Sequence, residues 1–264
     1  MHDVRPAAVA GMFYPGAPAR LAADVRGYLA SAGAAPGAPP KAVIVPHAGY
    51  IYSGPVAAAA YARLAALRGA VTRVVLLGPT HRVPVRGLAL PESRAFAMPL
   101  GQVTIDEDAV ALACRLPQVS RSDAAHAQEH ALEVQLPFLQ TVLGSFSLVP
   151  FAVGQASPAE VAEVIDLLWG GSETLVVVSS DLSHYHSYAD ARRIDRQTAD
   201  AILALAPNLD HEQACGATPI NGLILSARRR GMQPALLDLR NSGDTAGDRA
   251  RVVGYASFAF SDHA

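Results

Sequence analysis

Short, uninterrupted apolar runs alternate with helical segments along most of this chain. The clearest runs are KAVIVP (residues 41–46), RVVLL (73–77) and TLVVVS (174–179). A strand that is apolar at every position must be covered on both faces, which is typical of the parallel sheets of α/β proteins. The pattern therefore predicts an α/β fold with a mainly parallel central sheet and helices on both faces.

The remaining elements are predicted from periodicity and from turn residues. Pro150 lies within one predicted strand, which we expect at a sheet edge or at a bulge because proline cannot donate a ladder hydrogen bond. The stretch at 32–40 is too short to separate two domains. Further strands are expected at 87–90, 147–153, 234–239 and 251–259, and helices at 18–31, 55–68, 106–115, 130–143, 159–168, 188–205 and 219–230.

The composition disfavours several classes of protein. Apolar residues make up 51% of the 264 residues and the formal net charge is −2, which argues against a disordered chain and against nucleic acid as a partner. The densest basic cluster, residues 228–230, is typical of a solvated helix end. Two cysteines, no signal-peptide pattern and no apolar run of about 18 residues predict a cytoplasmic protein that does not contact a membrane.

Histidine and aspartate residues follow the predicted strands at the points where they end. His47 follows KAVIVP, His81 follows RVVLL, and Asp181 and His184 follow TLVVVS. Asp244 comes after the strand expected at 234–239. Ligands of open α/β sheets bind beyond the carboxyl ends of the strands, so these side chains are predicted to share one crevice.

His47 and His81, expected on adjacent strand ends, are predicted to bind a metal ion. Two histidines and a carboxylate suit a divalent iron ion that keeps open positions for substrate. Zinc can use the same ligands, and the residue types do not exclude copper. His184 is predicted to act as a general acid or base, the usual role of histidine near neutral pH. Asp181 either shares this role or caps the following helix.

Several other polar residues are open to two interpretations, one structural and one functional. Asp244 lies in NSGDTAGD, which on spacing alone reads as a turn-rich loop. Cys215, in CGATP, is more typical of a small buried apolar residue than of a nucleophile. Glu129, His130 and Glu133 precede an apolar helix, where acidic groups complement the helix dipole or contact the crevice, and either glutamate could supply the carboxylate in place of Asp244. The chain has no GxSxG elbow, P-loop or GxGxxG motif after a strand.

Several segments together resemble the Memo-like family, whose bacterial and archaeal members are called AmmeMemoRadiSam system protein B. The resemblance extends in order along nearly the whole chain, so residues 1–264 are expected to form a single Memo-like domain. The matching segments are AGMFYPG, VPHAGYIYSG, LLGPTH, EHALEVQLPFL, VVSSDLSH, CGATPI, and NSGDTAGD followed by VVGYASF.

The resemblance implies the fold of class III extradiol ring-cleaving dioxygenases, in which two histidines and a glutamate bind non-haem iron. His47 and His81 are similar to the two metal histidines, and His184, with Asp181 before it, to the acid/base position. Animal Memo proteins have a cysteine as the third ligand in the loop before the last strand. This chain has none there, and Asp244 is the expected substitute. The side chains expected to support the ligands or to contact substrate are those of Glu129, His130, Tyr52 and Cys215.

Three functional hypotheses follow from the resemblance. The first is a redox enzyme with iron or copper, dioxygenase-like, acting on a small phenolic molecule or on dioxygen. The second is a non-catalytic module that binds a peptide or small ligand in the same crevice, as the phosphotyrosine-bearing partners described for the animal protein imply. The third is a role in a modification pathway beside AMMECR-like and radical S-adenosylmethionine proteins. Fold alone does not decide among them.

Overall fold

The computed structural model describes residues 3–33 and 37–262 of the chain. The long apolar runs form the longer inner strands, and amphipathic segments form the helices between them. The strands are β1 (Val4–Arg5), β2 (Ala42–Val45), β3 (Arg73–Pro79), β4 (Leu88–Leu90), β5 (Ala95–Phe96), β6 (Val103–Ile105), β7 (Val119–Arg121), β8 (Ser147–Val153), β9 (Thr174–Ser179), β10 (His184–His186), β11 (Gln233–Asn241) and β12 (Val252–Ser261). The helices are α1 (Pro18–Ala32), α2 (Tyr50–Tyr61), η1 (Ala62–Leu67), α3 (Glu107–Ala113), α4 (Asp123–Ala127), η2 (Glu133–Gln135), α5 (Leu136–Leu143), α6 (Pro158–Leu167), α7 (Tyr188–Leu203), α8 (Ala217–Arg229) and α9 (Ser242–Thr245).

The central sheet is mixed and mostly parallel. Its strands are hydrogen-bonded in the order β1-β5-β6-β8-β3-β9-β2-β12-β10, with β11 on β12, and with β4 and β7 beside β8. The four strands β8, β3, β9 and β2 at its centre are all parallel to their neighbours in this set. Antiparallel pairing begins only at β12, which runs against β2. The predicted fold class is confirmed.

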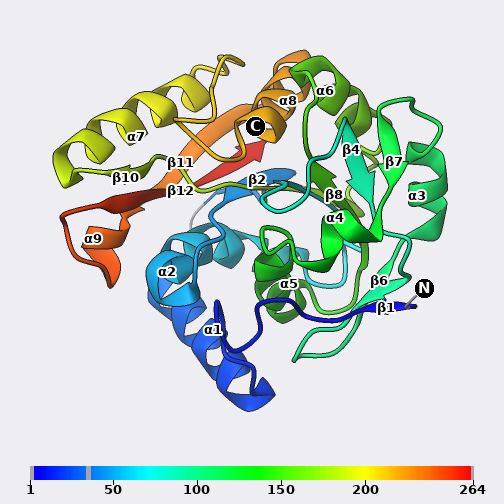
Figure 1. Cartoon of the computed structure of the whole chain (residues 1–264), viewed down its shortest axis with the longest axis horizontal. Helices are drawn as coiled ribbons and strands as arrows, with labels where there is room; N and C mark the ends of the chain where they lie inside the picture. The colour runs from blue at the N-terminus through cyan, green and yellow to red at the C-terminus, as the bar shows by residue number, and fades with distance from the viewer. Residues whose placement is uncertain (1–2, 34–36, 263–264) are drawn as a thin grey trace.

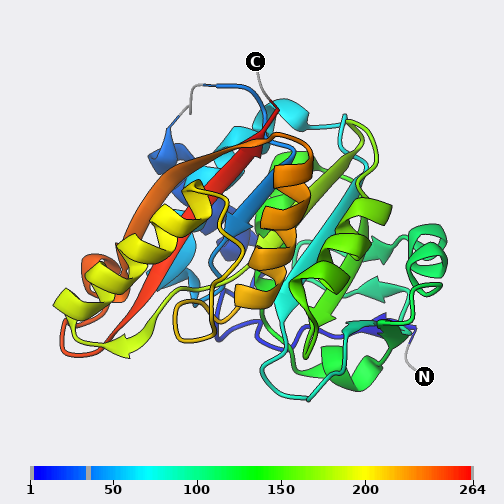
Figure 2. The same cartoon turned by 90° about the horizontal axis from the view of Figure 1, so that it is seen from above.

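Helices cover both faces of this sheet, as Figure 1 shows. Helices α1, α2 and α5 lie together on one face, where α1 packs against α2 and α5. Helices α6, α7 and α8 lie on the other face, which is turned toward the viewer in Figure 2. There α8 packs against α6 and over β3 and β9, whereas α7 packs on β11 and β12. Because β2, β3, β8 and β9 run in the same direction, the loops after them meet at one edge of the sheet.

Strand β8 is interior, so the expectation of an edge or a bulge at Pro150 was wrong. One side of β8 pairs with β3 along all seven residues. On its other side the short strand β6 pairs with Ser147 and Leu148, and β4 pairs with Ala152 and Val153. Pro150 lies in the gap between these two short partners, where the missing N–H group costs no ladder hydrogen bond.

Two predicted helices begin at other residues because of specific hydrogen bonds. The helix expected from residue 55 begins at Tyr50, whose N–H group donates to the carbonyl of Phe13 (2.8 Å). The helix expected from residue 130 begins later, at η2, because the Glu129 carboxylate accepts the N–H groups of His130 and Ala131 and holds them in a turn. Local side-chain hydrogen bonds of this kind compete with the helix ladder.

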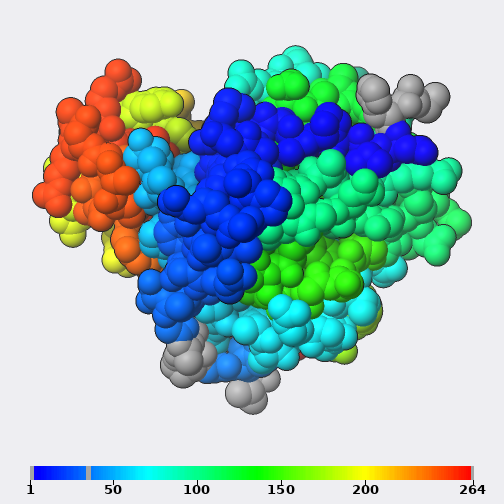
Figure 3. Space-filling view, turned by 90° about the horizontal axis from the view of Figure 1, so that it is seen from below, coloured from blue at the N-terminus to red at the C-terminus, as the bar shows by residue number. Residues whose placement is uncertain are grey.

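The N-terminal segment lies across one face of the molecule, where it is blue in Figure 3. It is fastened there by Arg5, whose guanidinium donates to the carbonyls of His126 and Glu129 and to the Glu133 carboxylate. The segment thus covers the outer side of the turn at residues 129–133, which leads into η2 and α5. Among the described residues, no helix is long and apolar enough to cross a membrane.

Candidate metal centre

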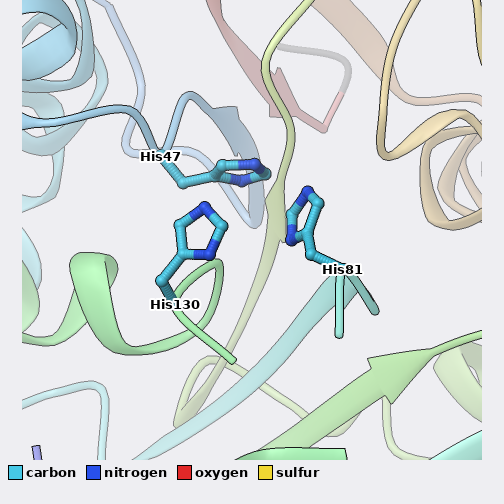
Figure 4. Close-up of side chains that lie close together, drawn as sticks. All are labelled: His47, His81 and His130. Atoms are coloured by element: carbon cyan, nitrogen blue, oxygen red, sulfur yellow. The ribbon is translucent and has the colours of Figure 1, made fainter. Parts of the chain in front are cut away.

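Three histidines converge at the carboxyl edge of the sheet. One nitrogen from each of His47, His81 and His130 lies within 4.8 Å of those from the other two, a spacing at which one metal ion could contact all three. The ring centroids are 5.2 Å apart for His47 and His81, 5.3 Å for His47 and His130, and 4.6 Å for His81 and His130. Figure 4 shows the three rings pointing toward a common centre.

These histidines come from three separate loops. His47 follows β2 and His81 follows β3, but these strands are not adjacent as expected, because β9 lies between them. The rings still meet because both loops turn inward over the end of β9. His130 comes from the turn between α4 and η2, which no strand delivers to this edge. The sequence predicted that His130 would contact the crevice but not that it would join the histidine group.

Glu129 hydrogen-bonds the ring of His81 and lies close to that of His130. Its Oε1 atom is 2.9 Å from Nδ1 of His81 and 3.4 Å from Nδ1 of His130, and its Oε2 atom accepts the N–H group of His81. Burial raises the pKa of this carboxyl, but hydrogen bonds from His81 and Ala131 outweigh burial and lower the pKa to about 2. The carboxylate is therefore ionised and can only accept, so Nδ1 of His81 carries the proton of this hydrogen bond.

The side chain of Ser179, at the end of β9, fixes the tautomer of His47. The hydroxyl of Ser179 donates its one proton to the carbonyl of Ala131 (2.7 Å). It accepts from Nε2 of Gln135 (2.8 Å) and lies 2.9 Å from Nδ1 of His47. Gln135 is itself oriented, because its Oε1 atom accepts from the hydroxyl of Tyr61. Nδ1 of His47 must therefore donate to Ser179, which leaves the lone pair on Nε2.

This arrangement fits a metal ion. Metal-binding histidines usually donate the ring N–H that faces away from the ion to a carboxylate or other acceptor. Burial, with the neighbouring His81, lowers the pKa of His47 to about 3. Burial, with His47 and His81, lowers the pKa of His130 to about 4. Both rings are therefore neutral at physiological pH, as metal binding requires.

The lowered pKa of His130 predicts that the stability of the protein depends measurably on pH. An unfolded His130 titrates near 6.5, so between about pH 4 and 6.5 the unfolded chain holds one proton more than the folded chain at this residue. Stability therefore falls as the pH falls through this window. In metal-free protein, we expect His130→Asn to reduce the slope of the free energy of unfolding against pH by about 1.4 kcal/mol per pH unit around pH 5. Urea titrations at several pH values test this, and equal slopes would contradict it.

Asp181 and His184 lie beside this group. Asp181 does not cap the next helix, because that position in α7 is taken by Ser187. Its Oδ1 atom instead accepts the N–H group of His47 (2.8 Å), and its Oδ2 atom lies 3.9 Å from Nε2 of His47. Burial raises the pKa of Asp181, and the nearby His184 opposes this rise. His184 is near enough to act on the charge of Asp181 but forms no ion pair with it in the described chain, and the acid/base role of His184 stays a prediction.

The other sequence-derived carboxylate ligands lie elsewhere. Asp244 is not in the histidine group: its Oδ1 atom accepts from the hydroxyl of Tyr188, and its Oδ2 atom accepts the N–H group of Asn241. The turn at α9 engages Asp244 as a helix-capping residue, which is why it does not reach the strand ends. Glu133 points to the N-terminal segment, where it pairs with Arg5. Tyr52 lies in the first turn of α2.

A cleft opens beside the histidine group. Its volume is about 720 Å³, and it is lined by Pro79, Thr80, His81, Pro84, Val85, Arg86, Val153, Gly154, Gln155, His211 and Cys215. The thiol of Cys215 lies 3.4 Å from Nε2 of His47. Burial, with the nearby Asp181, raises the pKa of this thiol to about 12, so it is not a thiolate nucleophile here. Arginine is the only charged residue type in this lining, so the cleft carries no carboxylate.

Comparisons with known proteins agree with this picture. The family model of the Memo-like proteins matches residues 5–259. A MEMO1 family protein of Sulfolobus acidocaldarius is 35% identical, over 98% of this chain and all of its own, and one of Ignicoccus hospitalis is 36% identical, over 97% and 98%. The fold is shared with an uncharacterized protein of Escherichia coli K12, with a TM-score of 0.54, 12% identity, and coverage of 82% of this chain and 98% of that one. This chain belongs to the family of Memo-like proteins.

Proposed function

We propose that this protein is a metal-dependent, dioxygenase-like oxidoreductase that holds a divalent iron ion on His47, His81 and His130. The observation that carries the proposal is the convergence of three imidazoles within 4.8 Å, two of them oriented by a buried carboxylate or hydroxyl through Nδ1. Imidazole ligands suit iron, copper and zinc. Iron is chosen among them because the dioxygenases that the chain resembles use it.

His47, His81 and His130 would hold such an ion, and His81 also lines the cleft. When bound, a divalent ion would act there as a Lewis acid that also supports redox chemistry. The lining of the cleft combines apolar side chains with several polar ones and a single guanidinium, Arg86, so a small anionic or phenolic molecule suits it. His184, beside Asp181, would give or take a proton at the edge of this site.

Metal analysis of protein purified without oxygen tests this proposal. We expect about one iron per chain in the unaltered protein, and iron near background in His47→Ala, His81→Ala and His130→Ala, because each change removes a direct ligand. His186→Ala is the matched control, since His186 lies in β10 outside the histidine group, and it should keep its iron.

Two outcomes bear on separate parts of the proposal. If His47→Ala and His81→Ala bind iron as well as the unaltered protein, the metal site itself is wrong. If the protein purified without oxygen carries copper or zinc in place of iron while the three variants lose that metal, the site stands and the choice of iron is wrong.

A further inference from the structure

A second cavity lies at the other end of the sheet from β8, between α7 and the corner formed by β11 and α9. Figures 1 and 2 show α7 lying along β11, with α9 at the outer end of the same strand. The cavity has a volume of about 530 Å³ and shares no lining residue with the cleft beside His81. It is lined by Tyr188, Ala189, Arg192, Arg193, Asp195, Arg196, Leu239, Arg240, Asn241 and Asp244.

Guanidinium groups dominate the charge of this cavity. Four arginines line it, against two aspartates. Arg193 and Arg240 are held by Asp190 and Asp238, which stabilises their positions at the rim. Arg196 pairs with no group in the described part of the chain, and the guanidinium of Arg192 only stacks over a tyrosine ring (5.7 Å). Two cations of α7, one helical turn apart, therefore face the cavity without a counter-ion.

The two aspartates of the lining are engaged by other groups, and neither forms an ion pair with Arg192 or Arg196 in the described chain. Asp195 is buried, its Oδ1 atom accepts the N–H group of Ser183, and its Oδ2 atom lies against Gly254 in β12. Burial raises the pKa of Asp195 to about 6, so this carboxylate stays mostly ionised at neutral pH. The Asp244 carboxylate is occupied by the hydroxyl of Tyr188 and by the N–H group of Asn241.

Asn241 supplies a further hydrogen-bond donor at the wall of the cavity. Its side chain is almost fully buried, with 1% of the residue exposed, and it lines the cavity. Its Oδ1 atom accepts the N–H group of Gly243 as the cap of α9, so Nδ2 is the group left to face the cavity. Nδ2 is not among the enclosed polar atoms that lack a partner in the described chain, so it is open to the cavity. An anion in the cavity would find an amide donor at this wall.

We propose that this cavity binds a soluble small molecule that carries a phosphate group. Arg192, Arg196 and Nδ2 of Asn241 would contact the phosphate, since several guanidiniums and an amide donor match its oxygens. The first turn of α7, which begins at Tyr188, adds the positive end of a sixteen-residue helix on the same side. The volume exceeds that of a single anion and lies in the usual range of small-molecule sites, so an organic group would occupy the rest.

Calorimetric titration with inorganic pyrophosphate, at an ionic strength of about 0.15 M, tests the proposal. We expect saturable binding to the unaltered protein and a loss of at least about tenfold in affinity for Arg196→Gln, because a charge-assisted contact is removed. Asn241→Asp should lose as much. Aspartate keeps the acceptor that caps α9, so this variant should fold, but it replaces the Nδ2 donor with a negative charge.

Arg26→Gln is the matched control, because Arg26 is exposed on α1, far from the cavity, and it should bind pyrophosphate as the unaltered protein does. The proposal is overturned if pyrophosphate does not bind saturably, or if Arg196→Gln and Arg26→Gln bind it equally well. Co-sedimentation with phosphatidylglycerol vesicles distinguishes the source of the phosphate. A soluble ligand predicts no sedimentation, whereas vesicle binding that Arg196→Gln abolishes would assign the cavity to a lipid headgroup instead.

Discussion

Glu133→Ala should lower the free energy of unfolding by about 3–5 kcal/mol, because it leaves a buried guanidinium without its counter-ion. Glu133 is fully buried and pairs with Arg5 at 2.6 Å. The same carboxylate accepts the N–H groups of Ala8 and Val9 and the hydroxyl of Tyr14. One side chain therefore holds the whole N-terminal segment on the turn that carries His130. Urea denaturation of the metal-free protein measures the effect.

Two further variants separate the ion pair from general damage to the core. Arg5→Met together with Glu133→Leu should recover part of the lost stability, since apolar pairs of similar volume often replace buried ion pairs without loss. Arg20→Ala removes the exposed pair of Arg20 with Asp24 and should change stability little. A Glu133→Ala variant as stable as Arg20→Ala would show that the buried pair does not hold the fold.

The sequence predicted the centre of this fold better than its margins. Runs such as TLVVVS are apolar at every position, and they became the inner strands β2, β3 and β9 with small shifts at their ends. Strands β1 and β5 contain two residues each, too few to show a period, and only pairing with distant neighbours defines them. Which strand lies between β2 and β3 also depends on contacts far apart in the sequence, so the predicted adjacency of these strands was wrong.

The same limit applies to the candidate site. His47 and His81 could be chosen because each follows a recognisable buried strand. His130 follows no strand, and it reaches the group only because the turn around Glu129 folds back over the strand ends. Glu129 and Glu133 are four residues apart and equivalent in the sequence, yet one supports the histidines and the other pairs with Arg5, 128 residues away. In the sequence, the polar residue Ser179 at the end of an apolar run was the one indication of the side chain that supports His47.

Glu129→Gln should weaken metal binding by about 100-fold, the upper end of the range for such outer contacts, because its carboxylate accepts a hydrogen bond from the ring of His81 and holds the turn that carries His130. Glutamine matches the shape of glutamate but has one acceptor oxygen. Either orientation of its amide places an NH₂ group against the N–H group of His81 or against those of His130 and Ala131. We therefore also expect a loss of about 1–3 kcal/mol in the free energy of unfolding.

Competition with a chelator gives the metal affinity, and the rank order of variants is the sharper test. Ser179→Ala removes the support of His47 alone and should weaken binding less than Glu129→Gln, by about 10-fold. Glu92→Gln changes an exposed glutamate and should bind metal as the unaltered protein does. If the folded Glu129→Gln protein, checked by circular dichroism, matches Glu92→Gln in affinity, then the orientation of His81 and His130 by this carboxylate has no part in metal binding. The three imidazoles would then have to be held in place by the packing of their loops alone.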